Sequence, residues 1–350
     1  MKKFLSAIAA LSVLTAALAG CGSSASTSTT TATTTATTTA ATAAVTEAAA
    51  QGTGSEYKVA IVQQLDHTSL DEIRLAMEAE LDKKAAEKGI TITYKEFNGQ
   101  NDATVLNQIG AQVVSDGYDA IIPIATLAAT TMATATEDNQ IPVIYAAISD
   151  PGEAQLTGIA NVTGTSDALN TPFILDMMLA VNPDIKTVGL LFSNSEDNSI
   201  TPIAEAKKYL DEKGIAYLEK TGNTTDEILT AASAMVGRVQ AVFTPTDNVV
   251  MAAASAVAEI LNEAGIPHYT GADSFVTAGA FATCGVNYTE LGTYTADMAV
   301  DILLGGAVPE YHVMDGGIIT VNTDTAKALG LDYGVFKDMA GTVKKVTTQE

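Results

Sequence analysis

The chain has 350 residues, of which 47% are hydrophobic, and its formal net charge at pH 7 is −23. This length allows about two globular domains with ordinary hydrophobic cores. A surface with such an excess of acid repels phosphate groups, which argues against a nucleic acid partner and against direct adsorption to anionic lipid.

The first residues are typical of an export signal. Lys2 and Lys3 precede an apolar, uncharged run over residues 4–19, and small residues stand directly before Cys21. A positive start, a short apolar run and small residues at the cut describe a secretory signal peptide, here residues 1–20. The run is shorter than the ~20 residues of a membrane-spanning helix, so we favour cleavage over a permanent anchor.

Cys21 directly follows this predicted cut, and the segment resembles the lipobox of bacterial lipoproteins. The resemblance implies acylation of the Cys21 thiol, with palmitate among the expected lipids. The protein would then work on the outer face of the cell membrane, and the lipid alone would hold it there.

Residues 21–55 are expected to form a disordered tether behind the acylated cysteine, because Ser, Thr, Ala and Gly cannot bury enough apolar surface to fold. The second cysteine, Cys284, lies in an apolar run typical of a strand. We interpret it as a small buried hydrophobic side chain and not as a catalytic thiol.

From residue 56 onward, short apolar strands alternate with helices. In the first half we predict strands at residues 58–62, 90–94, 120–124 and 141–145, and helices at 70–88, at 101–115 and up to residue 136. This alternation predicts a parallel sheet covered by helices on both faces.

The same order then repeats. Strands are predicted at residues 187–192, 240–244 and 266–269, with helices at 201–213 and from residue 223. We therefore predict an α/β fold of two doubly wound parallel-sheet lobes. Ligands bind beyond the carboxyl ends of such strands, so the gap between two facing lobes is the expected site.

The last part of the chain is expected to cross back between the lobes. We predict a strand at residues 281–288, a helix at 291–304 and a strand at 317–321, with the crossings forming a multi-strand hinge. The expected boundaries are residues 56–163 plus 281–307 for the first lobe, 164–280 plus 308–325 for the second, and 326–350 for a C-terminal extension.

Six short motifs follow the strands in order, at residues 64–67, 124–129, 149–151, 161–164, 194–199 and 245–248. Together they resemble the ABC-transporter substrate-binding family that includes tryptophan/tyrosine-type receptors, on the type I periplasmic binding protein fold. The resemblance covers about residues 57–330. Ala146 and Ser149 depart from it, since Ser and Thr are usual there, and this concerns the ligand more than the fold.

The resemblance implies a solute-binding protein that captures a small ligand, with an aromatic amino acid favoured, by closure of its lobes and passes it to ABC permease subunits. We expect a monomer. The alternatives are a ligand sensor feeding a signalling partner and a receptor for a sugar or other small solute. The sequence has no Gly-rich phosphate loop, G-x-S-x-G turn, paired-His helix or Cys/His cluster, so we expect no catalytic residue, metal or cofactor.

A zwitterionic amino acid needs donors for its carboxylate and an acceptor for its ammonium. Ser195, Asn198 and Ser199 precede a helix and are predicted to hold the carboxylate, although side chains of this kind also cap helices. For the ammonium we favour Asp273 over Asp150 and Asp247, each of which could instead bond its own loop backbone. The other expected cleft residues are Gln64, His67, Thr126, Thr246, Asn248 and Asn287.

Overall fold

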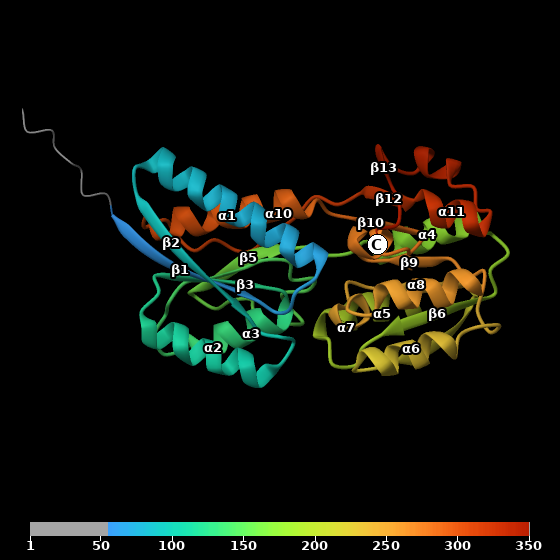
Figure 1. The fold of residues 1–350 in the computed structure, drawn as a ribbon, viewed down its shortest axis with the longest axis horizontal. Helices are drawn as coiled ribbons and strands as arrows, with labels where there is room; N and C mark the ends of the chain where they lie inside the picture. Colours follow the sequence, from blue (N-terminus) through green and yellow to red (C-terminus); the bar gives the residue numbers. More distant parts are fainter. Residues whose placement is uncertain (1–54, 350) are drawn as a thin grey trace, which may run out of the picture. The chain divides into compact units, whose positions relative to one another are not determined.

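The computed structural model describes residues 55–349, which form two sheets with helices on both faces of each (Figure 1). The predicted signal peptide, Cys21 and nearly all of the predicted tether lie outside the described residues. Within residues 55–349, no helix is long and apolar enough to cross a membrane.

The first sheet has six strands in the order β11-β5-β4-β3-β1-β2, and every neighbouring pair is parallel. The strands are β1 (Glu56–Gln63), β2 (Thr91–Asn98), β3 (Ala120–Ile124), β4 (Val143–Tyr145), β5 (Val162–Ser166) and β11 (His312–Val313).

Alternation along β1 explains how this sheet is covered. Val59 and Ile61 face the helices α1 (Thr68–Lys88) and α10 (Tyr288–Leu303), whereas Ala60 and Val62 face α2 (Ala103–Asp116) and α3 (Thr126–Ala135). Figure 1 shows these two helix pairs on opposite faces of the sheet. Side chains that alternate between two buried faces are what a parallel sheet inside an α/β lobe requires.

The second sheet has seven strands in the order β13-β12-β10-β9-β8-β6-β7, and only the β10–β12 pair is antiparallel. The strands are β6 (Thr187–Phe192), β7 (Ala216–Thr221), β8 (Ala241–Thr244), β9 (His268–Thr270), β10 (Ala282–Gly285), β12 (Ile318–Asn322) and β13 (Thr342–Val346).

Helices again cover both faces of the second sheet. α4 (Thr171–Val181), α5 (Ile200–Lys213) and the 3-10 turn η2 (Gly334–Asp338) pack on one face. The other face carries α6 (Thr225–Ser233), α8 (Ala254–Glu263) and α9 (Asp273–Thr277), and three shorter elements complete the chain: η1 (Asp197–Ser199), α7 (Asn248–Met251) and α11 (Thr323–Leu329). The predicted class, two doubly wound α/β lobes, is confirmed.

Within residues 55–349 the chain crosses between the sheets three times, after β5, after β10 and after β11. The strand pairing differs from the expected boundaries. β10 pairs with β9 and β12 and so lies in the second sheet, and the return to the first lobe begins with α10. β11 pairs with β5 and thus extends the first sheet.

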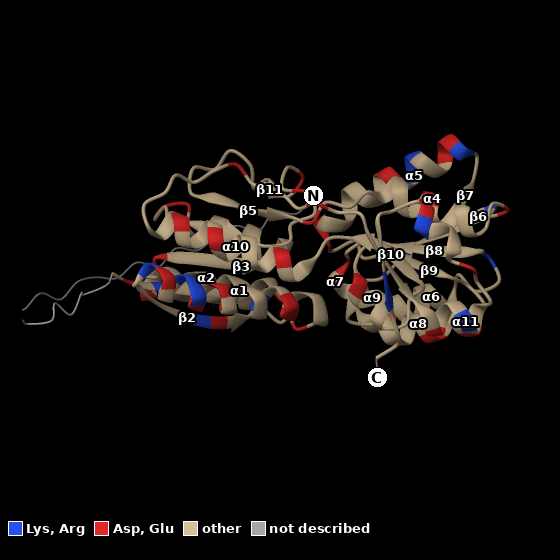
Figure 2. Ribbon diagram, turned by 90° about the horizontal axis from the view of Figure 1, so that it is seen from above, with Lys and Arg blue, Asp and Glu red and all other residues tan. Residues whose placement is uncertain are grey.

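The segment expected as a C-terminal extension also contributes to the second lobe. β13 pairs with β12 in parallel, and the side chain of Phe336, just before it, is fully buried. Lys344 and Lys345 lie on β13, which is an edge strand, so its polar sequence fits a place at the border of the sheet. Asp and Glu residues occur in both lobes (Figure 2).

Candidate functional site

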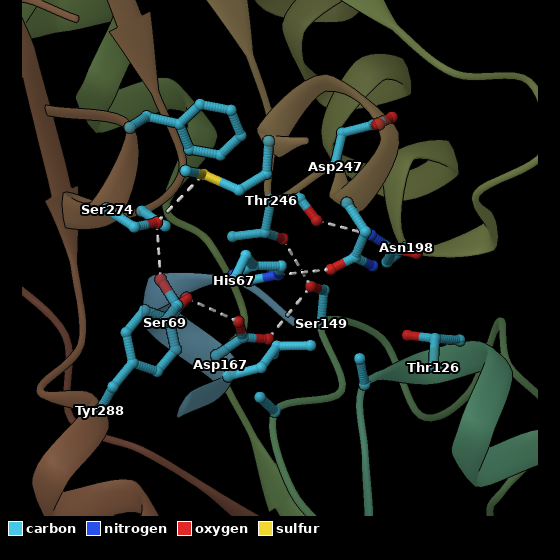
Figure 3. Close-up of a pocket in the computed structure, with 17 residues that line it drawn as sticks. His67, Ser69, Thr126, Ser149, Asp167, Asn198, Thr246, Asp247, Ser274 and Tyr288 are labelled. Carbon is cyan, nitrogen blue, oxygen red and sulfur yellow. Dashed lines mark hydrogen bonds between the residues drawn. The ribbon is translucent and has the colours of Figure 1, made fainter. Parts of the chain in front are cut away.

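A pocket lies where the carboxyl ends of strands from both sheets meet. Its walls come from the segments that follow β1, β3, β4 and β5 in the first lobe and β6, β8, β9 and β10 in the second (Figure 3). This is the position at which doubly wound sheets bind ligands.

The pocket brings together half of the predicted site residues. Those that line it are His67, Thr126, Asn198, Thr246, Asp247 and Asn248. They come from both lobes, so the prediction of a site between the lobes agrees with the position of this pocket.

Asp167 is the buried carboxylate of the pocket, and the sequence-based prediction missed it. It follows β5 in the first crossing between the lobes, and its residue is 4% exposed. Ser149 Oγ donates to Oδ1 at 3.0 Å and the Tyr288 hydroxyl donates to Oδ2 at 3.1 Å (Figure 3). Burial raises the pKa of Asp167 above its usual range, against the lowering effect of these two hydrogen bonds.

The described lining of the pocket contains carboxylate side chains and no lysine or arginine that would balance their charge. Asp167 and Asp247 both line it, and none of the described lining residues is a lysine or an arginine. A buried carboxylate is costly when no positive charge faces it. Such a wall therefore suits a ligand that brings a cationic group.

Asp247 plays a different part from Asp167, because its oxygens are already occupied by protein donors. Oδ1 accepts the Val250 N–H at 2.9 Å as the cap of α7, and Oδ2 accepts the Ser193 N–H and the Ser199 hydroxyl, each at 2.7 Å. This carboxylate fixes the loop geometry of the second lobe behind the pocket.

His67 begins a chain of hydrogen bonds that runs through the wall. Its Nε2 lies 3.1 Å from Asn248 Oδ1, and the Asn248 amide donates to Glu196 Oε2 at 2.6 Å. Glu196 also accepts from Gln64 Nε2 at 3.3 Å, which joins the second lobe to the first. Burial and then the neighbouring Asp247 raise the pKa of Glu196 to about 8, while burial lowers the pKa of His67.

Three further hydrogen bonds join the lobes around the pocket. Ser69 Oγ donates to Ser274 Oγ at 2.6 Å, and Ser149 Oγ lies 2.9 Å from Thr246 Oγ1. The Thr201 hydroxyl donates to Asp150 Oδ2 at 2.7 Å. The described arrangement is thus one in which the two lobes are in contact.

The rest of the wall is largely apolar. Leu70 comes from the first lobe, and Met251, Ala272 and Phe275 come from the second. These side chains offer a surface against which a hydrophobic ligand group can pack.

Two residues on the first-lobe side of the pocket have a strained backbone. Ala125 has φ 75° and Ala147 has φ 59°, and both residues line the pocket. Non-glycine residues with positive φ are uncommon and often mark ligand sites. Ala125 directly precedes α3, so its conformation directs the first turn of that helix and Thr126 toward the pocket.

The other six predicted residues do not line the pocket. Gln64 and Ser199 lie behind the wall, bonded to Glu196 and Asp247, and Ser195 bonds Ser193. Asn287 caps α10, and Asp150 accepts the N–H groups of Gly152 and Glu153 in a turn. Asp273 lies at the start of α9 and forms an ion pair with Lys344 at 3.0 Å.

Asp167 was missed because no strand was predicted directly before it, at the expected boundary between the lobes near residues 163 and 164. Its signal in the sequence is an acid that follows the short, mostly polar strand β5 and stands before the Asn170 cap of α4. Cys284 is buried, as expected, and burial raises the pKa of its thiol to about 11. Residues 55–349 contain no group of three or more His, Cys, Asp or Glu side chains placed to hold a metal ion.

Comparisons with known proteins agree with this architecture. A family model described as ABC transporter substrate binding protein matches residues 58–334. A tyrosine-binding protein from Clostridioides difficile strain R20291 is 31% identical over 299 residues, which cover 83% of this chain and 85% of the relative.

Two solved structures extend the comparison. An ABC domain in complex with L-Trp from Streptococcus pneumonia is 30% identical, with a TM-score of 0.77 over 83% of this chain and all of that one. A ligand-free, open structure of a substrate binding protein with adhesive properties from Clostridium difficile is 32% identical, with a TM-score of 0.63 over 84% of this chain and all of that one. The chain therefore superposes better on the L-Trp complex, although its identity to the open structure is slightly higher.

Proposed function

Because the chain belongs to the ABC transporter substrate-binding protein family, and so is a solute-binding protein and not an enzyme, we propose that it binds an aromatic L-amino acid between its two lobes for import. The observation that carries this proposal is the buried carboxylate of Asp167, in a pocket whose described lining holds no basic side chain.

The ligand ammonium would pair with Asp167. Ser149 and Tyr288 fix the orientation of this carboxylate, and each of its oxygens keeps a lone pair for a further donor. A cation placed there would compensate the buried charge, and a hydrogen bond between two charged groups is stronger than one between neutral groups.

The ligand carboxylate would lie at the start of α3. Thr126 contributes a hydroxyl group to the pocket, and α3 begins at this residue. The first N–H groups of a helix have no partner within it and carry the positive end of its dipole, so they attract anions. In α3 the Leu127 N–H already donates to Gln64 Oε1 at 2.9 Å, so we assign the N–H groups of Thr126 and Ala128 to the ligand. Asn198 of the second lobe also lines the pocket, but its amide N–H already donates to a backbone carbonyl oxygen of that lobe at 2.6 Å.

The ligand side chain would occupy the apolar part of the pocket, against Leu70, Met251 and Phe275. The tyrosine-binding relative and the L-Trp complex support an aromatic side chain.

Calorimetric titration of the purified protein with the twenty L-amino acids and with glucose, galactose and ribose tests the proposal. We expect binding of aromatic amino acids, and a ligand at one hundred times its Kd should add about 2.7 kcal/mol to the free energy of unfolding. Binding of a sugar, with no response to any amino acid, would contradict it.

We further propose that the lobes close on the ligand and that acylated Cys21 tethers the protein to the outer face of the membrane, where permease subunits receive the ligand. The lipobox-like segment before Cys21 supports the anchor. Cells fed a palmitate analogue should label the wild-type protein but not Cys21→Ser, and equal labelling of both would refute acylation at this residue.

A further inference from the structure

The orientation of the Asn248 amide determines which nitrogen of His67 carries its proton. Asn248 Nδ2 donates to Glu196 at 2.6 Å, so Oδ1 is the amide atom that faces His67. An amide oxygen can only accept. With this orientation of the amide, His67 donates through Nε2–H.

The second ring nitrogen of His67 has no partner. Nδ1 is buried, and none of the described residues forms a hydrogen bond with it. Burial lowers the pKa of His67, so the ring is neutral at neutral pH and Nδ1 holds a free lone pair. The His67 ring lines the pocket, between the Asp167 and Thr246 side chains in the view of Figure 3.

We propose that His67 Nδ1 accepts a hydrogen bond from the ligand side chain and thereby makes the pocket prefer tyrosine and tryptophan to phenylalanine. This inference rests on the proposed function. A phenol O–H or an indole N–H would satisfy the buried acceptor, whereas phenylalanine would leave it unpaired and desolvated. A binding site that forms a hydrogen bond with a polar group of its ligand discriminates strongly against an analogue that lacks this group.

The other acceptors near the pocket are less available to a ligand side chain. Asp247 is occupied by three protein donors, and Asp167 has the charge that the ammonium requires. Ser69 Oγ donates to Ser274 Oγ, and Ser274 Oγ donates to Met251 Sδ, so the Ser69 oxygen is a rival acceptor.

Titration of the purified protein with L-tyrosine and L-phenylalanine tests the inference, since the two differ only by the hydroxyl group. We expect the wild type to bind tyrosine roughly ten- to a hundredfold more tightly. His67→Phe keeps a ring but removes the acceptor, so it should weaken tyrosine binding to the level of phenylalanine and leave phenylalanine binding nearly unchanged. Thermal melts check that this variant folds.

Two further variants sharpen the test. His67→Gln restores an acceptor oxygen and should regain part of the tyrosine preference. Ser69→Ala should keep the preference, and its loss there would assign the contact to Ser69 and overturn the inference.

The remaining outcomes separate the two proposals. Equal wild-type affinity for tyrosine and phenylalanine, or an equal loss of both in His67→Phe, would overturn the role of His67 while the proposed function stands. If neither amino acid binds and tryptophan also fails, the proposed function falls and this inference falls with it.

Discussion

At the scale of single residues, the aspartates at and near the pocket differ in the hydrogen-bond partners that they already have. Asp247 and Asp150 have their oxygens engaged by backbone N–H and hydroxyl groups, which makes them parts of the scaffold. Asp167 is held by two hydroxyl groups only and is buried in the wall of the pocket. This difference in partners singles it out for a ligand.

Asp167→Asn should weaken amino acid binding about ten- to a hundredfold, because the ammonium loses a charged partner while the side chain keeps its size. The ligand-free protein should be as stable or slightly more stable. A carboxyl whose pKa is raised in the folded state lowers the free energy of unfolding at pH values above its ordinary pKa of about 3.9. This loss grows as the pH rises, until the pH passes the pKa of the folded state. Titration calorimetry and urea unfolding at pH 5 and pH 7 measure both effects, and unchanged affinity would exclude Asp167 from the site.

Asp273→Ala should leave amino acid affinity unchanged, contrary to the role favoured from the sequence. Its ion pair with Lys344 is partly solvated, with the two side chains 21% and 54% exposed, so its loss should cost at most about 1 kcal/mol of unfolding free energy. A loss of binding comparable to that of Asp167→Asn would restore Asp273 as the ammonium partner.

The sequence predicted which side chains follow strands but not which of them are buried. His67 and Thr126 were found because each stands directly between a strand and a helix. Asp167 and Asp273 also stand at such junctions, yet only Asp167 faces the pocket, because the chain crosses between the lobes at that point. Burial at a lobe junction depends on tertiary packing, which a single sequence does not reveal.

At the scale of elements, the packing of α1 against α10 joins segments that lie more than 200 residues apart in the chain. Gly292 on α10 allows this close approach. A Cβ atom there would lie 2.4 Å from the Ile73 carbonyl oxygen of α1 and 3.1 Å from Ala76 Cβ. The obstacle is backbone, which cannot rotate away.

Gly292→Ala should therefore destabilise the protein even though alanine favours helices. The gain in helix propensity is about 1 kcal/mol, whereas overpacking against backbone costs about 1–3 kcal/mol or more, so we expect a net loss. Gly341→Ala, where a Cβ atom meets nothing within 4 Å, is the matched control and should change the unfolding free energy little. Greater stability of Gly292→Ala in urea would contradict the described contact.

The accuracy of the predicted elements followed the strength of their local signal. The apolar run at residues 187–192 was predicted with the bounds of β6, and α1 and α5 end at residues 88 and 213 as predicted. Each of these helices is followed by a glycine in the left-handed conformation, Gly89 and Gly214. β7 and β13 were missed because edge strands with exposed Glu and Lys side chains lack an apolar run. These two segments form strands because they pair with a neighbouring strand, and not because of a local signal in their own sequence.

At the scale of the whole molecule, the wall of the pocket links the two lobes through Glu196. Its carboxyl accepts from Gln64 of the first lobe and from Asn248 of the second, beside the buried Asp247. If the lobes separate to admit a ligand, the Gln64 contact breaks and water reaches this carboxyl. Its pKa would then return toward the ordinary glutamate value of about 4.3.

Lobe closure should therefore take up a proton, and this predicts the sign of a pH effect on binding. With the lobes in contact the pKa of Glu196 is about 8, and separation of the lobes lowers it. Between these two pKa values the closed form holds a proton that the open form lacks. Rising pH then disfavours closure, and affinity for the amino acid should fall by at most tenfold per pH unit, since one proton is linked.

Glu196→Gln imitates the protonated group, so titrations from pH 6 to 9 should show a flatter profile and tighter binding than wild type at pH 8. Glu212→Gln, on the exposed end of α5, should keep the wild-type profile. An unchanged slope in Glu196→Gln would mean that Asp247 or Asp167 carries the linkage, because all three carboxyls lie buried at or beside this pocket.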